Sequence, residues 1–201
     1  MIVVIDYGMG NLGSVAKALN YLGYSATVSS DPAVVAKADR LVLPGVGAMT
    51  YAMSQLEERG LDQAIREFMT TERPFLGVCL GMQLMFERSE EGDARGLAVL
   101  PGIVRRFPDL PGLKVPHMGW NRLHDSRLAI LPEGGSFYFV HSYYVDPADK
   151  SLVAAWTTHG IPFAAAVSQD QILLTQFHPE KSGEAGLAIL RGWVEEKAIK
   201  Q

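Results

Sequence analysis

Cys79 is the single cysteine of this 201-residue chain, and it ends an apolar run that is followed at once by a helical pattern. Gly77 and Gly81 stand two residues before and after it, where a side chain would collide with a sharp strand-to-helix turn. Such a turn presents the thiol to solvent at a helix N-terminus, and this position favours the reactive thiolate. The alternative is a buried cysteine that packs as a small hydrophobic residue. The spacing therefore predicts a nucleophile elbow.

A thiol nucleophile needs a base, and the best candidate is His178, which follows the apolar run at residues 172–175. Pro179 disfavours the helical region for the preceding residue, so we expect extended backbone at His178 and side chains at 178 and 180 that point the same way. Glu180 then orients one ring nitrogen while the other faces the thiol. The alternative is a histidine that merely ends a strand. The pattern predicts a Cys79, His178 and Glu180 triad.

A tetrahedral intermediate also needs hydrogen-bond donors for its oxyanion. The N–H of Leu80, directly after the nucleophile, is the usual first donor at an elbow. Residues 44–47 read Pro-Gly-Val-Gly after a predicted strand, and their glycines permit close backbone approaches. A Pro-Gly turn is common in loops without function, so its place after a parallel strand carries the argument. We expect the second donor to be the Val46 N–H.

The elements that position these groups alternate in the first half of the chain. Apolar strands are expected at residues 2–6, 26–29, 40–43 and 75–79, and helices near residues 14–22, 50–59 and 61–70. This alternation predicts an α/β fold, a three-layer doubly wound domain with a mostly parallel central sheet. Active residues then gather at the carboxyl ends of the strands.

The second half has short β-rich pieces, read as antiparallel additions to the sheet, and it closes with an amphipathic helix. The pieces are residues 104–107, 136–145, 152–157, 163–168 and 172–176, and the helix is residues 184–197 with Leu187, Leu190, Trp193 and Val194 on one face.

Composition excludes several classes of protein. We expect one domain over residues 1–201, because nothing marks a linker and 48% hydrophobic with 20% charged residues is ordinary for a packed α/β domain. The formal net charge of −4 without a basic run argues against nucleic acid. With no signal-like start and no run of about 18 apolar residues, we expect a cytoplasmic protein without a membrane partner. One cysteine and scattered histidines predict no metal site.

Residues 44–47, 77–83 (Gly-Val-Cys-Leu-Gly-Met-Gln) and 177–182 (Phe-His-Pro-Glu-Lys-Ser) occur in one order, and with them the chain closely resembles the class I, triad-type glutamine amidotransferases. The resemblance spans nearly the whole chain. Residues 6–12 (Asp-Tyr-Gly-Met-Gly-Asn-Leu), 116–121 (Pro-His-Met-Gly-Trp-Asn) and 138–144 (Tyr-Phe-Val-His-Ser-Tyr-Tyr) resemble the members whose glutaminase is a separate subunit.

The resemblance implies hydrolysis of L-glutamine through a glutamyl thioester, with no cofactor. It also implies a heterodimer with a (βα)8-barrel cyclase subunit of histidine biosynthesis, which receives the ammonia. On the family pattern Cys79 attacks the side-chain amide, His178 transfers the proton and Glu180 orients His178. Glutamine is then held by Gly47, Gln83, Glu91, His141, Ser142 and Tyr143, and the partner interface and ammonia exit are lined by Asn11, Trp120, Tyr138 and Lys181.

Three alternatives stay open. The chain can be the glutaminase subunit of another amidotransferase, such as pyridoxal phosphate synthase, although residues 6–12 and 116–121 argue against it. A Cys-His peptidase or amidase on a similar sheet would share the elbow, and turnover of glutamine against peptide decides between them. A scaffold without catalysis is disfavoured, because all three triad residue types are present.

Overall fold

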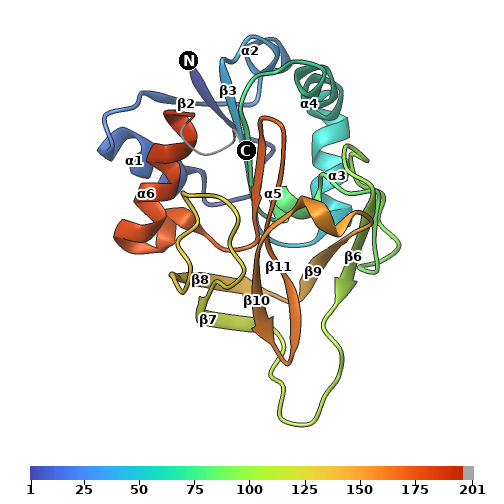
Figure 1. The fold of residues 1–201 in the computed structure, drawn as a ribbon. Helices are drawn as coiled ribbons and strands as arrows, with labels where there is room; N and C mark the ends of the chain where they lie inside the picture. Colours follow the sequence, from blue (N-terminus) through green and yellow to red (C-terminus); the bar gives the residue numbers. More distant parts are fainter. Residues whose placement is uncertain (197–201) are drawn as a thin grey trace.

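A computed structural model describes residues 1–196, and in it helices cover both faces of a central sheet (Figure 1). The strands are β1 (Ile2–Ile5), β2 (Ala26–Ser29), β3 (Arg40–Gly45), β4 (Phe75–Cys79), β5 (Arg88–Ser89), β6 (Gly102–Arg106), β7 (His117–Arg122), β8 (Ser136–His141), β9 (Tyr143–Pro147), β10 (Val153–His159), β11 (Ile161–Gln169) and β12 (Ile172–Thr175). The helices are α1 (Leu12–Tyr21), α2 (Pro32–Ala36), α3 (Met49–Glu58), α4 (Leu61–Met69), α5 (Leu80–Gln83) and α6 (Gly183–Val194), with short 3-10 turns η1 (Lys150–Leu152) and η2 (Pro179–Lys181).

The central sheet has seven strands in the order β10-β11-β12-β4-β3-β1-β2. Strands β2, β1, β3, β4 and β12 pair in parallel, and β11 pairs antiparallel with both β12 and β10. The expected mostly parallel sheet is therefore confirmed, with β10 and β11 as its antiparallel additions. The pieces expected at residues 104–107 and 136–145 form separate small sheets instead, and β12 pairs in parallel with β4. Two smaller sheets, β5-β6-β9 and the β7-β8 pair, flank the lower half of β10 and β11 in the view of Figure 1, with β7 and β8 on the left and β6 and β9 on the right.

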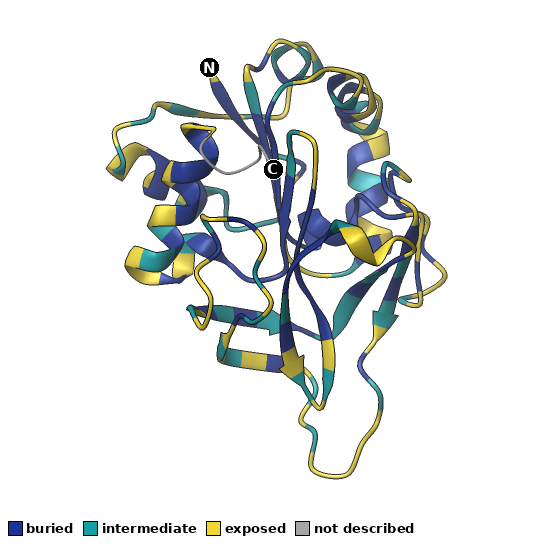
Figure 2. Cartoon of the chain, viewed as in Figure 1, coloured by how far each residue is buried: buried dark blue, intermediate teal, exposed yellow. Residues whose placement is uncertain are grey.

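The core follows the two-residue period of the strands. In β1, Val3 and Ile5 pack with the residues of α3 and α4, whereas Ile2 and Val4 pack with those of α1 and α6. All residues of β1 and β4 are buried, as both faces of a parallel strand are in such folds, and Figure 2 shows this buried centre. The edge strand β2 is half-exposed. The three-layer architecture thus follows from apolar strands with two buried faces.

The structure departs from the sequence prediction in several elements. Helix α2, capped by the Asp31 carboxylate on the Ala33 N–H, was not predicted, nor were strands β5 and β7. Residues 136–145 do not form one strand, because the chain divides at Ser142 between β8 and β9. The closing helix ends at Val194, and Lys197 lies outside the described residues. Within residues 1–196, no helix has the length and apolar character needed to cross a membrane.

Candidate active site

The turn at Cys79 has the geometry of a nucleophile elbow. Cys79 has φ 55° and ψ −109°, a conformation that non-glycine residues rarely adopt. A Cβ on Gly81 would overlap the Leu43 carbonyl oxygen, and one on Gly77 would lie 2.7 Å from Leu174 Cδ2. Both glycines are therefore required by close packing, as the sequence predicted, and the backbone strain at Cys79 is of the kind that clusters at active sites.

The expectation that the thiol is presented to solvent is wrong. Cys79 is only 5% exposed, because strand β8 and the Gln176 side chain cover it. Its Sγ lies 3.9 Å from the Val140 carbonyl oxygen, and the Gln176 side-chain amide donates to the sulfur at 3.6 Å. Helix α5 has four residues, so its dipole is small. The sulfur is thus held in a cavity, in contact with a backbone carbonyl and a side-chain amide.

His178 and Glu180 meet as predicted. His178 Nδ1 lies 2.8 Å from Glu180 Oε1, and both side chains are almost completely buried. His178 is extended, with φ −97° and ψ 97°, but Glu180 lies in the turn η2 instead of a continuing strand. The turn closes because the Ser182 hydroxyl and the Lys181 N–H both donate to the His178 carbonyl oxygen, at 2.6 and 3.1 Å. The local fold therefore fixes the imidazole orientation.

The electrostatics of His178 favour its charged form. Burial lowers its pKa, but the Cys79 sulfur and the Glu180 carboxylate outweigh this effect and raise the pKa to about 9. Among the described residues, His178 Nε2 is buried without a hydrogen-bond partner, so it remains available to the sulfur or to a reacting group. A protonated imidazole beside a thiolate is the arrangement that acyl transfer from an amide requires.

Residues 44–47 follow β3 at the same edge of the sheet as Cys79, since Gly45 pairs with Cys79 in the β3–β4 register. The Tyr7 hydroxyl donates to the Pro44 carbonyl oxygen at 3.0 Å and anchors the start of the loop. Burial, and then the Cys79 charge, raise the pKa of Tyr7, so this hydroxyl stays a donor. Val46 and Leu80 directly follow the paired Gly45 and Cys79 in the chain, so their N–H groups are the candidate donors to an oxyanion.

A cavity of about 310 Å³ opens over the cysteine, large enough for one amino acid. The elements that line it are the loop after β3, the elbow, the loop between β5 and β6, and the joint between β8 and β9. Its lining residues are Val46, Gly47, Cys79, Leu80, Gln83, Glu91, Pro116, Val140, His141, Ser142 and Tyr143. The structure therefore brings the predicted oxyanion and glutamine-binding residues around the predicted nucleophile.

Gln83 and Glu91 are polar groups of the cavity wall with fixed orientations. The Gln83 amide donates both hydrogens, to Tyr143 O at 3.0 Å and to Gln176 Oε1 at 3.1 Å, so its Oε1 is the atom available to a ligand ammonium. Glu91 Oε2 accepts from the Met49 N–H at 2.8 Å and caps α3, which has no side-chain cap of its own. Each residue thus keeps one oxygen for a ligand.

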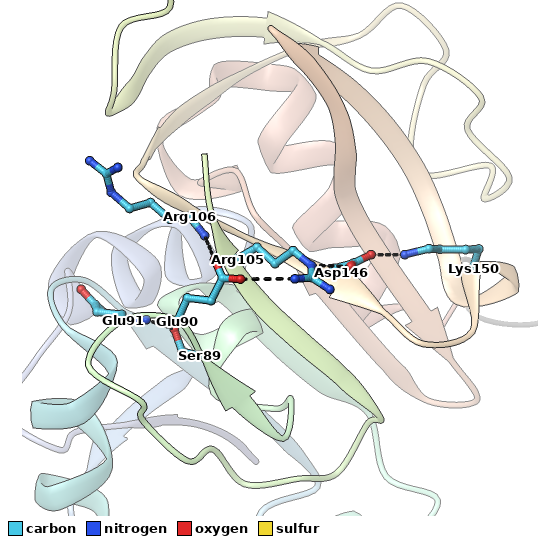
Figure 3. Close-up of polar contacts among 7 residues, drawn as sticks. All are labelled: Ser89, Glu90, Glu91, Arg105, Arg106, Asp146 and Lys150. Atoms are coloured by element: carbon cyan, nitrogen blue, oxygen red, sulfur yellow. Dashed lines mark hydrogen bonds and ion pairs between the residues drawn. The ribbon is translucent and has the colours of Figure 1, made fainter. Parts of the chain in front are cut away.

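An ion-pair network holds the segment that carries Glu91 (Figure 3). Arg105 on β6 binds Glu90 Oε1 at 3.2 Å and Asp146 Oδ2 on β9 at 2.6 Å, and Lys150 binds the other oxygen of Asp146. The Arg106 N–H also donates to Glu90 Oε2 at 2.9 Å. Because these groups are half-exposed, the pairs contribute more to the placement of the segment than to stability.

Three of the four predicted interface residues form one exposed cluster. The Trp120 and Tyr138 rings are 6.2 Å apart, and Lys181 Nζ lies 5.9 Å from the Tyr138 ring centre. Trp120 is 59% exposed and is therefore not a core residue. Asn11 lies at the start of α1, where its side chain accepts from the Ser14 hydroxyl at 2.8 Å. Helix α1 contacts the turn η2, which carries Lys181.

Sequence reasoning missed three groups at the centre. Val140 and Gln176 contact the sulfur, and His117 bonds to His141 behind the cavity wall. Gln176 directly precedes the 177–182 motif, and His117 lies inside the 116–121 motif. The available signal for both was a polar side chain within or next to a motif. Val140 acts through its carbonyl, which residue type does not reveal.

Comparison with known proteins agrees with this geometry. The family model "Glutamine amidotransferase class-I" matches residues 3–196. The chain is 54% identical to imidazole glycerol phosphate synthase subunit HisH of Syntrophotalea carbinolica, over 96% of this chain and 98% of the relative. It is 50% identical to the subunit of the same name from Dechloromonas aromatica, over 96% of this chain and 95% of the relative.

Solved structures support the fold. A crystal structure described as a glutamine amidotransferase superposes with a TM-score of 0.75 at 20% identity, over 97% of this chain and 98% of that one. The structure of PurLQS from Thermotoga maritima gives a TM-score of 0.72 at 15% identity, over 98% of each chain. At this identity the likeness concerns the architecture alone.

Proposed function

Because the chain belongs to the class I glutamine amidotransferase family, we propose that it is the glutaminase subunit of an imidazole glycerol phosphate synthase. It hydrolyses L-glutamine to L-glutamate and supplies ammonia for histidine biosynthesis. Residues 1–201 act as one glutaminase domain. The observation that carries the proposal is the strained Cys79 at the floor of an amino-acid-sized cavity, beside the buried His178–Glu180 pair.

In the first half of the reaction, the Cys79 thiolate attacks the side-chain amide carbon of glutamine. A C–S bond forms, and the carbonyl electrons move to oxygen, where the Val46 and Leu80 N–H groups stabilise the negative charge. The intermediate collapses, the C–N bond breaks, and the His178 imidazolium gives its proton to the departing nitrogen. Ammonia leaves, and a glutamyl thioester remains on Cys79.

In the second half, neutral His178 takes a proton from water, and the resulting hydroxide attacks the thioester carbon. The C–S bond breaks, glutamate is released, and the thiolate and imidazolium are restored. Glu180 keeps the imidazole oriented and stabilises its charged form in both halves. The α-amino and carboxylate groups of glutamine are bound by the polar groups of the wall, Gly47, Gln83, Glu91 and the 141–143 segment.

Ammonia passes to a (βα)8-barrel cyclase subunit, which forms imidazole glycerol phosphate and aminoimidazole carboxamide ribotide. This partner binds the surface of Asn11, Trp120, Tyr138 and Lys181. Three arguments support the location: the exposure of Trp120, the adjacent cation, and the position of Lys181 directly after the triad glutamate. Ammonia that reached solvent would be protonated and lost, so the two active sites are expected to connect directly.

The test measures glutamine hydrolysis and synthesis by the complex with the cyclase subunit from the same source. Cys79→Ala is expected to abolish glutamine-dependent synthesis and to leave synthesis from added ammonium salt intact. Full glutaminase activity in this variant would refute the nucleophile. Peptide turnover without glutamine turnover by the wild type would refute the function in favour of a peptidase.

A further inference from the structure

Two buried histidines, His141 in the cavity wall and His117 behind it, form a chain of hydrogen bonds in which the direction of each bond is determined. His141 Nδ1 lies 2.7 Å from the Tyr143 carbonyl oxygen, which can only accept, so Nδ1 carries the proton. Burial lowers the pKa of His141 to about 3, so the ring is neutral and its Nε2 is an acceptor. His117 Nδ1 lies 3.0 Å from that Nε2 and must be the donor.

The chain of hydrogen bonds continues from His117 to Asn121, both on strand β7. Burial, and then His159, lower the pKa of His117 to about 4, so its Nε2 is also an acceptor. The Asn121 amide donates to this Nε2 at 3.2 Å, and its second hydrogen goes to the Thr158 carbonyl oxygen at 2.9 Å. One arrangement of protons satisfies every contact. A pair of core histidines that only filled space would not require a single tautomer at each ring.

The chain also continues inwards to the nucleophile. The Tyr143 carbonyl oxygen that accepts from His141 accepts from the Gln83 amide as well, at 3.0 Å. Gln83 donates in turn to Gln176 Oε1 at 3.1 Å, and the Gln176 amide donates to Cys79 Sγ at 3.6 Å. Unbroken hydrogen bonds therefore join the surface strand β7 to the reactive sulfur through the wall of the cavity.

Strand β7 has one face that points into the protein and one that points to solvent. Its inward side chains include His117, which is 5% exposed, and Asn121. Its outward side chains include Met118 and Trp120, which are 62% and 59% exposed. Trp120 belongs to the surface assigned to the cyclase under the proposed function. A partner seated on the outer face therefore contacts the same strand that carries the first links of the chain.

We propose that His117 is a positioning residue that couples the outer face of β7 to the glutamine site, by fixing the 141–143 segment, Gln83 and Gln176 around Cys79. This inference rests on the proposed function. When the cyclase binds Trp120 and Met118, it fixes β7, and the histidine chain transmits that placement to the atoms that bind glutamine. His117 touches neither the substrate nor the sulfur.

Two substitutions separate the hydrogen bonds from packing. His117→Phe keeps a ring against His159, whose ring centre is 4.2 Å away, but removes both hydrogen bonds. His117→Asn places an amide nitrogen near the position of Nδ1 and restores the donor to His141. His159→Phe is the matched control, since it changes a neighbouring imidazole that bonds to Lys114 O and lies outside the chain.

The assay is glutamine hydrolysis by each variant in complex with the cyclase, with kcat and KM separated, and with ammonia-dependent synthesis and the melting temperature as checks. We expect His117→Phe to raise KM and to lower kcat/KM about tenfold, as loss of a buried hydrogen bond does. His117→Asn should recover most of this loss, and His159→Phe should match the wild type. Wild-type KM in His117→Phe, or equal losses in the Phe and Asn variants, would overturn the proposal.

Nitrogen NMR of the histidine rings in the full chain gives a test that needs no activity. At pH 7 both His117 and His141 should appear as neutral Nδ1–H tautomers, and His117→Phe should change the Nε2 signal of His141, which loses its donor, while the proton stays on Nδ1. An Nε2–H tautomer or a charged ring at either position would refute the chain. A wild-type complex that leaves glutamine intact would refute the proposed function instead, so the two failures are distinguishable.

Discussion

Glu180→Gln tests whether a buried carboxylate sets the protonation state of the candidate base. The carboxylate lies 2.8 Å from His178 Nδ1, and both side chains are at most 2% exposed. The glutamine variant keeps an oxygen that accepts from Nδ1 and has nearly the same volume. It removes only the negative charge. The imidazole is therefore expected to stay in place while its charged form loses a stabilising partner.

The magnitude follows from the pKa of His178, which burial lowers and which Cys79 and Glu180 together raise to about 9. An opposite charge at this distance moves a pKa by about 1 to 3, so His178 in the variant should titrate between about 6 and 8. Because the imidazolium protonates the departing ammonia, kcat/KM falls as pH rises through this pKa. The alkaline limb should thus move from about 9 to between about 6 and 8.

The same shift has a consequence for stability. The pKa of His178 is higher in the folded chain than its ordinary value of 6.5, so protonated His178 stabilises the fold fully below pH 6.5. This contribution is lost as pH rises through about 9. It corresponds to about 3 kcal/mol of unfolding free energy, shared between Glu180 and Cys79. The difference in melting temperature between variant and wild type should therefore shrink as pH rises towards about 9 and vanish above it.

The assay is kcat/KM for glutamine between about pH 5.5 and 10, measured on the complex with the cyclase saturated with its own substrate. Glu184→Gln is the control, since it makes the same change at an exposed position in the first turn of α6. An alkaline limb in Glu180→Gln that coincides with the wild type would refute the argument. An equal shift in Glu184→Gln would attribute the effect to overall charge.

The remaining predictions concern the elbow, the interface and the oxyanion loop. Gly81→Ala should lower glutamine hydrolysis at least about 10²-fold and destabilise the chain by about 1 to 3 kcal/mol, because the new Cβ overlaps the Leu43 carbonyl oxygen. Gly13→Ala, which adds a Cβ in open space, is the control in both the melting and the activity assays. Lys181→Ala should weaken the stimulation of glutaminase rate by the cyclase ligand without loss of assembly, and wild-type stimulation would leave Lys181 as an ordinary surface cation. The isolated chain should hydrolyse glutamine about 10² to 10³ times more slowly than the liganded complex, because reorientation of the Val46 N–H supplies one oxyanion donor; steady-state rates of the lone chain equal to those of the complex would contradict this.

Much of the site could be predicted because its parts are local. The elbow depends on Gly77 and Gly81, which must be glycine for steric reasons that follow from the turn itself. The contact between His178 and Glu180 depends on a single turn. Parallel strands bring such local motifs to one edge of the sheet, as predicted, and there Gly45 pairs with Cys79.

The parts that could not be predicted depend on contacts between distant segments. Gln176 bonds to Cys79 across 97 residues, and His117 bonds to His141 across 24. A glutamine or histidine in a β-rich segment has many possible partners, and residue type alone does not select one. The burial of Cys79 has the same origin, since it depends on how β8 crosses over the elbow.

The division of residues 136–145 at Ser142 shows why a correct periodicity can still give the wrong strand. Phe137, Phe139 and His141 are buried in β8, and Val145 and Pro147 are buried in β9, so the alternation keeps its phase across the break. The pattern therefore contains no sign that β8 pairs with β7 while β9 pairs with β6. A joint between two sheets leaves backbone groups without a strand partner on one side, and the cavity opens at this joint. The cavity wall thus forms where one continuous alternating pattern is divided between two sheets. Only the pairing of the strands in the structure reveals this division.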